Sequence, residues 1–486
     1  MGSAPSIKKN FVLNMIYTVS GILFPLVTFP YASRILLADG IGQVHFFTSL
    51  IEYIMLLTSI GIPLYAIREI ARVRDNHALM SKTATEILIL HTVLSATGYL
   101  IVFLLICTVT QIQADVPLFL LLSVSILFKS IGVEWFYNGI EDFKYITVRS
   151  IIVRILSLIA LFVFVRDKDD LFYYAAISVA GTVGSNVFNF FRLPKYVNIH
   201  SFGWKDLQIW KHLKPAMKIF ALNLIISLYV SLDSIMLGFL KNETTAVGYY
   251  TASTRISQTL VGLVGTLGPV LLPRLSNLAG RNSSEEFRSL ADKSLRFIIA
   301  LSLPITAGVF FMASPIIHLF CGNHFEPSVL TLQIMSPVIL FISVSGFYNM
   351  QILYSLGKEK LAILSVSLGA LINLILNFCL IPAYSQYGAG IATVIAELIV
   401  VISTLIIGRK YIPVHIFSKK KIHYYIATVL LIVFLSSLKL VGMNEVYYLI
   451  IGTVVSVIVY YTYLMLVKDE IIIQITKSCI KIVSRS

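Results

Sequence analysis

The chain has 486 residues, of which 57% are hydrophobic and 13% are charged, and it carries a formal net charge of +14. Soluble domains carry roughly 25% charged residues, so this chain has too little polar surface to cover a soluble globule of its size. The composition therefore excludes a soluble enzyme or a nucleic-acid-binding protein, and it predicts a chain that lies largely in lipid.

The apolar runs are continuous and about twenty residues long, as in residues 422–438, which is the length that a helix needs to cross a bilayer. Membrane β-strands instead alternate apolar and polar residues over about ten positions. We therefore predict an all-α polytopic membrane protein with about fourteen transmembrane helices. In chain order, the expected spans are 11–33, 43–67, 83–110, 115–138, 146–165, 170–191, 219–240, 247–272, 297–320, 328–356, 361–381, 388–407, 422–438 and 446–467.

The loops between these spans are short and differ in charge. If the N-terminus is cytoplasmic, 30 of the 38 Lys and Arg residues fall on inner segments and five on outer ones. Cytoplasmic loops of membrane proteins carry such an excess, so we expect both termini to be cytoplasmic and the number of spans to be even. Because no loop can hold a catalytic domain and no HExxH, P-loop or GxSxG motif occurs, we expect no enzymatic activity, no metal site and no cofactor.

Two segments of the first half of the chain recur in the second half. Gly42 and Gly248 follow similar residues before the second and eighth spans, and Lys144 and Lys360 do so before the fifth and eleventh. The similar offsets favour two six-helix lobes related by a pseudo-two-fold axis along the membrane normal, with the site between them. Chance similarity of apolar helices is the alternative. The predicted division is residues 1–215 (spans one to six), 216–410 (spans seven to twelve) and 411–486 (two further helices and a cytoplasmic tail).

The first 150 residues contain two segments that resemble a known family. Residues 29–36 read FPYASRIL and are followed by Gly40-Ile41-Gly42, and residues 134–143 read EWFYNGIEDF. These segments are similar to those of bacterial oligosaccharide-lipid flippases. That group comprises the O-antigen and polysaccharide-unit translocases of the multidrug/oligosaccharidyl-lipid/polysaccharide exporter superfamily.

This resemblance implies a function, a location and a mechanism. Such a protein moves a polyprenyl-pyrophosphate-linked oligosaccharide from the inner to the outer leaflet of the bacterial cytoplasmic membrane. The family implies a V-shaped pair of lobes with alternating access, a cationic central cavity and a monomeric protein. A proton or a sodium ion is the candidate coupling ion, and the expected partners are the substrate and the membrane lipids.

Charged residues inside or beside the spans are the candidates for this function, because a charge in lipid is costly and usually faces a cavity or a partner. Arginine binds phosphate through two parallel hydrogen bonds and lysine acts as a point charge, whereas a buried carboxylate can bind and release a proton. We expect the substrate headgroup to bind Arg34, Lys129, Arg154 and Arg255, and ion coupling or gating to involve Glu52, Glu134, Asp233 and Glu397.

Several of these residues have structural alternatives. Arg154 could reach the inner interface, and Glu134 lies near the inner end of its span. Asp233 and Arg255 fall at similar depth on consecutive helices, so they either pair structurally or separate to receive substrate or ion. The position of Glu397 leaves its role open.

Two other functions stay open at this point. A cation-coupled multidrug antiporter of the same superfamily would share the fold and the number of spans, but it would more naturally carry acids in its cavity. A membrane glycosyl polymerase or ligase would be expected to have a large outer loop, and the outer loops here are short.

Overall fold

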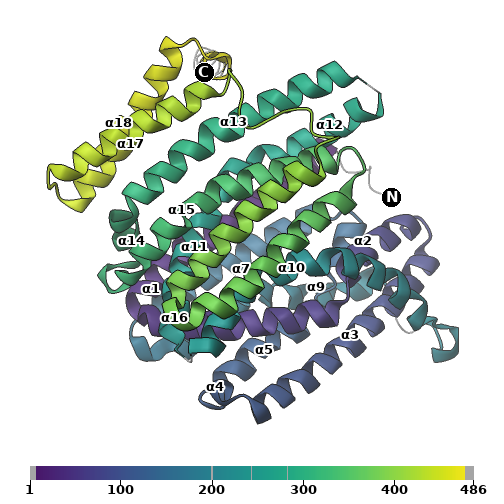
Figure 1. The fold of residues 1–486 in the computed structure, drawn as a ribbon. Helices are drawn as coiled ribbons and strands as arrows, with labels where there is room; N and C mark the ends of the chain where they lie inside the picture. Colours follow the sequence, from purple (N-terminus) through teal and green to yellow (C-terminus); the bar gives the residue numbers. More distant parts are fainter. Residues whose placement is uncertain (1–6, 199–200, 242, 282, 475, 477–486) are drawn as a thin grey trace. The chain divides into compact units, whose positions relative to one another are not determined.

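The computed structural model describes residues 7–198, 201–241, 243–281, 283–474 and 476. Within these ranges the chain is helical and contains no β-strand (Figure 1). Nine helices of the described residues are long and apolar enough to cross a membrane, and a bent pair brings the number to ten. The predicted all-α polytopic class is therefore confirmed, whereas the count of about fourteen spans stays a prediction.

The two longest helices are each broken near the middle. α1 (Ile7–Ser59) has 53 residues and would measure about 80 Å if straight, far more than the roughly 30 Å hydrocarbon core of a bilayer. Leu37 interrupts it with a φ of 60°, and Ser385 interrupts the 49-residue α16 (Glu359–Ile407) with a φ of 52°. The Ser403 hydroxyl donates to the carbonyl oxygen of Ser365, so the two halves of α16 lie antiparallel. Each of these helices supplies two segments of spanning length.

The chain divides into two compact units, Met1–Gly248 and Tyr249–Ser486. The predicted division at residues 215 and 410 stays a prediction, as does the cytoplasmic location of the two termini, which lie outside the described residues. Besides α1, the first unit contains α2 (Ile62–Val73), α3 (His77–Thr108), α4 (Thr110–Gln113), α5 (Val116–Ile131), α6 (Glu134–Gly139), α7 (Phe143–Phe164), α8 (Leu171–Val179), α9 (Asn186–Arg192), α10 (Leu213–Lys241) and the start of α11 (Thr244–Val264).

Short polar side chains set where the helices of this unit begin. Asn76, Asp115 and Asp142 accept hydrogen bonds from the first-turn backbone amides of α3, α5 and α7. α6 packs on α2 so closely that a Cβ on Gly139 would lie 2.8 Å from the side chain of Ile70. The EWFYNGIEDF segment thus belongs to the core of this unit.

The second unit is a stack of long helices. It contains the rest of α11, then α12 (Gly268–Gly280), α13 (Ser284–Phe311), α14 (Ala313–Cys321), α15 (Pro327–Gly346), α16, α17 (Ile422–Leu440) and α18 (Glu445–Leu466). α17 and α18 lie side by side as an antiparallel pair (Figure 1).

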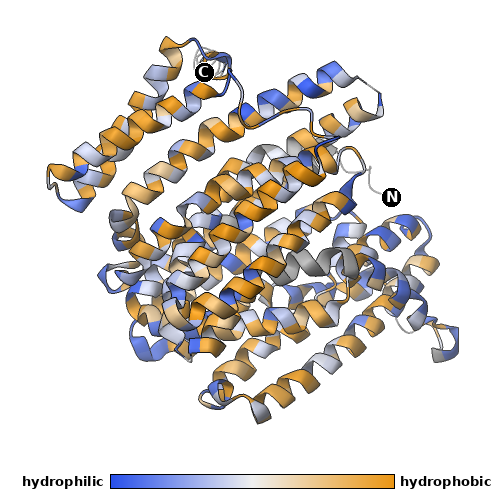
Figure 2. Ribbon diagram, in the orientation of Figure 1, coloured by the Kyte–Doolittle hydropathy of each residue, from blue (hydrophilic) through white to orange (hydrophobic). Residues whose placement is uncertain are grey.

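Hydrophobic residues run along these helices, and hydrophilic residues gather at places such as the N-terminal end of α13 (Figure 2). Large apolar side chains also lie exposed, among them Leu440 at 89% and Leu466 at 76%. Such exposure is unfavourable in water and favourable in lipid, which agrees with a membrane location for α17, which contains Leu440, and for α18, which contains Leu466.

Candidate functional site

Two of the predicted residues, Glu134 and Arg154, meet in a cluster at the α1–α6–α7 contact of the first unit. The Tyr17 hydroxyl donates to Glu134 Oε1 at 2.8 Å. Arg154 Nη1 donates to the carbonyl oxygen of Tyr17 at 3.0 Å and to the hydroxyl of Ser20, and its guanidinium lies over the Tyr17 ring. We call Tyr17, Glu134, Arg149 and Arg154 the Tyr17 cluster.

Arg149 is the buried cation of this cluster, with an exposed fraction of 6%. Its guanidinium lies 4.0 Å from Glu134 Oε1 and donates to the carbonyl oxygen of Ser185 at 2.7 Å. The expected span 146–165 contains Arg149, and the structure likewise places this residue inside α7. Because a buried charge needs a partner, Arg149 and Glu134 stabilise each other here.

A break between α5 and α6 positions Glu134. Val133 adopts a φ of 36°, and Glu134 directly follows it as the first residue of α6. A Cβ on the preceding Gly132 would lie 2.5 Å from the side chain of Asn186, so only glycine allows this close approach. The break turns Glu134 toward α1 and α7, which the helical periodicity of the sequence could not reveal.

The cation Lys129 lies near this break, at the end of α5. Its side chain is exposed, and it lies close enough to His91 of α3 to act on it electrostatically. Within the described part of the first unit it makes no hydrogen bond or ion pair. Lys129 is therefore available to an anion, whereas Arg149 and Arg154 already have protein partners.

The remaining predicted cations lie apart from the Tyr17 cluster. Arg34 lies in α1, three residues before the break at Leu37, and its side chain is exposed but not free of interactions. Arg255 lies in α11 within the second unit, where its side chain is also exposed.

The predicted carboxylates differ in burial. Asp233 is 6% exposed, whereas Glu52 is exposed. Both carboxylates lie close enough to Tyr53 to interact with it electrostatically, so the two acids lie near the same residue of the first unit. Glu397 is 5% exposed within α16 of the second unit. Asp233 belongs to the first unit and Arg255 to the second, and their pairing stays a prediction.

A buried polar network that the sequence did not predict joins α2, α3 and the segment before α10. Glu86 is fully buried and accepts hydrogen bonds from the Gln208 amide at 2.8 Å, from Lys211 at 2.7 Å and from His212 Nε2 at 2.9 Å. The Tyr65 hydroxyl lies 2.7 Å from His212 Nδ1. Burial lowers the pKa of His212, with Glu86 opposing the shift, so the neutral ring donates to Glu86 and accepts from Tyr65.

The two glycines of the sequence repeat lie in one reciprocal helix contact. A Cβ on Gly42 would lie 1.8 Å from the carbonyl oxygen of Thr244, and one on Gly248 would lie 1.9 Å from that of Ala38. Ala38 and Thr244 have the same spacing in the chain as Gly42 and Gly248. Reciprocal contacts between equivalent residues are what a two-fold axis produces, so this contact supports the internal repeat.

Long apolar helices, charges held between them and a two-fold-related helix contact define a polytopic α-helical protein of the transporter type. The model of the family described as polysaccharide biosynthesis protein matches residues 7–279, and the MatE model matches residues 219–379. The first match covers more than half of the chain, so this chain belongs to the polysaccharide biosynthesis protein family. The family resemblance seen in the sequence is confirmed.

Individual relatives extend the likeness over most of the chain. The chain is 25% identical over 400 residues to a putative O-antigen transporter of Shigella dysenteriae, covering 82% of this chain and 99% of that one. It shares its fold with the lipid II flippase MurJ in an inward closed conformation (TM-score 0.75, 16% identity, 94% and 99% of the two chains). It also shares it with an inward-facing multidrug resistance MATE family transporter of the MOP superfamily (TM-score 0.66, 15% identity, 80% and 93%).

Proposed function

We propose that this protein is a flippase that moves a lipid-linked oligosaccharide from the inner to the outer leaflet of a bacterial cytoplasmic membrane by alternating access. The observation that carries the proposal is the match along 99% of the Shigella dysenteriae putative O-antigen transporter. The substrate of the proposal is a polyprenyl-pyrophosphate-linked oligosaccharide. The protein acts as a monomer with both termini cytoplasmic, and a proton or sodium gradient drives it.

Cations inside the spans address the main energetic problem of this transport. A bare pyrophosphate is very unfavourable in the hydrocarbon layer, and fixed positive charges in a wet cavity offset that cost. Lys129 and Arg255 have exposed side chains within helices, which suits this role. Arg34 and Arg154 join them in the proposal, and Arg154 has to leave Tyr17 and Ser20 when the headgroup binds.

The acids supply the coupling in this scheme. Asp233 and Glu397 are buried, and a carboxylate that changes its exposure during the cycle takes up a proton on one side and releases it on the other. Glu52 and Asp233 both interact electrostatically with Tyr53. Glu134 belongs to the Tyr17 cluster together with two arginines.

The Gly42–Gly248 contact closes one end of the pathway in the proposal. Backbone atoms approach each other there without intervening side chains, so two helices can separate without repacking large residues. The Asp39 side chain accepts hydrogen bonds from Thr244 and Thr245 beside it, and these would break when the end opens.

A cation-coupled multidrug antiporter is the second candidate, because the MatE match covers residues 219–379 and the fold is shared with a MATE transporter. The near-complete match to the putative O-antigen transporter favours the flippase.

Translocation in liposomes that contain only this protein tests the proposal. The probe is a fluorescent polyprenyl-pyrophosphate oligosaccharide whose arrival in the opposite leaflet is detected with an impermeant quencher, with and without a proton or sodium gradient. We expect the wild type to move the probe, R255A to lose most of this activity and K360A, which removes an exposed cation at the start of α16, to retain it. No movement under any gradient by correctly folded protein would contradict the proposal.

A further inference from the structure

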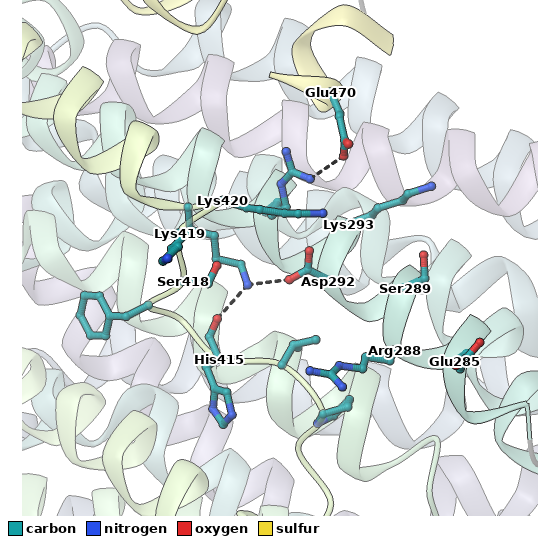
Figure 3. Close-up of a pocket in the computed structure, with 15 residues that line it drawn as sticks. Glu285, Arg288, Ser289, Asp292, Lys293, His415, Ser418, Lys419, Lys420 and Glu470 are labelled. Carbon is teal, nitrogen blue, oxygen red and sulfur yellow. Dashed lines mark hydrogen bonds and ion pairs between the residues drawn. The ribbon is translucent and has the colours of Figure 1, made fainter. Parts of the chain in front are cut away.

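A cavity of about 590 Å³ lies at one end of the second unit (Figure 3). The N-terminal part of α13, the segment of residues 413–421 before α17 and Glu470 just after α18 line it. Its lining contains six lysine and arginine side chains against three carboxylates, an excess of three positive charges. We call it the α13–α17 pocket. It is separate from every residue proposed above to carry transport.

The cations at the floor of this pocket already have carboxylate partners. Lys421 is 1% exposed, and its ammonium group donates to Asp292 at 2.7 Å and to the carbonyl oxygen of His415 at 2.8 Å. Arg296 is 4% exposed and binds Asp469 at 2.8 Å and Glu470 at 2.9 Å. Two buried cations thus face three carboxylates, so these contacts fix the shape of the pocket and do not call for an anion.

The excess of positive charge therefore lies on the rim. Arg288, Lys293 and Lys419 are exposed, and within the described part of the second unit they make no hydrogen bond or ion pair. Figure 3 shows the Arg288 guanidinium directed toward the 413–421 segment. Like charges gathered around a cavity repel each other, so an anion seated among them would relieve that repulsion. The fork of Arg288 matches the geometry of a phosphate group.

The walls of the pocket are held in place before any ligand arrives. The Tyr348 hydroxyl donates to the carbonyl oxygen of Val414 at 3.1 Å, and Lys421 ties the other end of the segment to α13 through Asp292. Asp469 accepts from the Ile471 amide at 3.0 Å while it binds Arg296, which holds the end of α18 against α13. A cavity of this size suits a small ligand or a lipid headgroup.

The position of the pocket favours a lipid as the source of the phosphate. α17 begins at Ile422 and α18 ends at Leu466, so the pocket lies where these apolar helices begin and end. Phe417 is 78% exposed beside it and stacks on Tyr425, as aromatic residues do at the level of lipid headgroups. Basic pockets at the ends of membrane helices are suited to anionic headgroups, which are abundant there.

We propose that the α13–α17 pocket binds the phosphate of an anionic phospholipid headgroup and so fixes the α17–α18 pair to α13. The site is distinct from the transport pathway and does not depend on the proposed function. Inorganic pyrophosphate shares the same chemistry without the acyl chains, so it serves as the soluble probe that separates the two sources.

Native mass spectrometry of the full-length protein in detergent, titrated with phosphatidylglycerol, phosphatidylcholine or inorganic pyrophosphate, tests this site. We expect preferential retention of phosphatidylglycerol, weakened roughly 30-fold in R288Q/K293Q, since each cation near a membrane surface contributes about 1 kcal/mol. The matched variant R409Q/K410Q removes two exposed charges outside the pocket, just before the 413–421 segment. It should bind almost as the wild type does.

Three results would overturn the proposal. Equal weakening of phosphatidylglycerol binding in R288Q/K293Q and R409Q/K410Q would show that the lipid is attracted to the positive surface as a whole and not to this pocket. Equal retention of phosphatidylcholine would show that the phosphate charge is not recognised. Binding of pyrophosphate that is lost in R288Q/K293Q, without binding of phosphatidylglycerol, would make the ligand of the pocket a soluble phosphate. Thermal unfolding of each variant shows whether it is folded. The side chains of Arg288 and Lys293 are both exposed.

Discussion

At the scale of single residues, the cations of the first unit divide by whether the protein already satisfies them. Arg149 is buried and donates to Ser185, and Arg154 donates to the backbone of α1. Lys129 is exposed and has no hydrogen bond or ion pair within the described part of its unit. Removing a satisfied cation leaves its partners unpaired, whereas removing Lys129 leaves no partner behind.

This difference predicts opposite consequences for two neutralising substitutions. R154Q should lower the free energy of unfolding by about 1–3 kcal/mol, because Tyr17 and Ser20 lose a charged donor. K129Q should leave the thermal unfolding temperature unchanged and slow transport roughly tenfold, equivalent to about 1.4 kcal/mol. Thermal unfolding in detergent and liposome transport of both variants measure this. Equal loss of stability in both would show that Lys129 is structural.

The buried His212 predicts a pH dependence of stability. Its pKa in the folded protein is lowered from 6.5, first by burial and against the pull of Glu86. The unfolded chain therefore binds a proton more readily, so this contribution to stability is full above about pH 6.5 and falls as the pH drops below it. Thermal unfolding between pH 7.5 and 5 should show a decline that is smaller in H212Q. The exposed His77 provides the control H77Q, and an identical decline in all three proteins would contradict the assignment.

The sequence could identify charges but not their partners. Glu134 and Arg154 stand out because they interrupt apolar runs, and the structure brings them together. Glu86 and His212 are 126 residues apart, and no periodicity or motif connects them. The α13–α17 pocket is likewise assembled from three distant segments. Contacts of this kind depend on how helices pack, which local sequence patterns do not record.

At the scale of helices, hydropathy was informative where a helix is single and apolar. The expected spans 146–165, 422–438 and 446–467 correspond to α7, α17 and α18 within a few residues. The breaks at Leu37 and Ser385 were anticipated only as gaps between spans, because neither residue favours a positive φ. Their conformations are imposed by packing of the flanking helices, which a single sequence does not show.

The reciprocal glycine contact predicts the effect of adding one methyl group. In G42A the new Cβ would overlap the Thr244 carbonyl oxygen, so α1 and α11 would have to move apart. We expect transport to fall at least tenfold, equivalent to about 1.4 kcal/mol. In an otherwise cysteine-free protein that carries T245C, we expect a water-soluble maleimide to label this cysteine faster when G42A is also present. Gly262 has nothing within 4 Å of the corresponding position, so G262A is the matched control. Similar behaviour of G42A and G262A would show that this contact does not close the pathway.

At the scale of the whole molecule, composition and family point the same way. A chain with 13% charged residues folds into long apolar helices, and its repeat glycines meet across a two-fold-related contact. Membership of the polysaccharide biosynthesis protein family and the fold of a lipid II flippase agree with that architecture. The proposal that the cargo is an anionic lipid-linked sugar then follows from the cations inside the helices and from the match to the putative O-antigen transporter.

The measurement that tests this central proposal most directly compares two cargoes in the same proteoliposomes. One is a fluorescent polyprenyl-pyrophosphate oligosaccharide, and the other is the cationic dye ethidium, with a proton or sodium gradient applied in each case. We expect movement of the oligosaccharide lipid, lost when Lys129, Arg154 and Arg255 are neutralised together, and no gradient-driven movement of ethidium. Transport of ethidium without the oligosaccharide lipid, or full flipping by the triple variant, would contradict it.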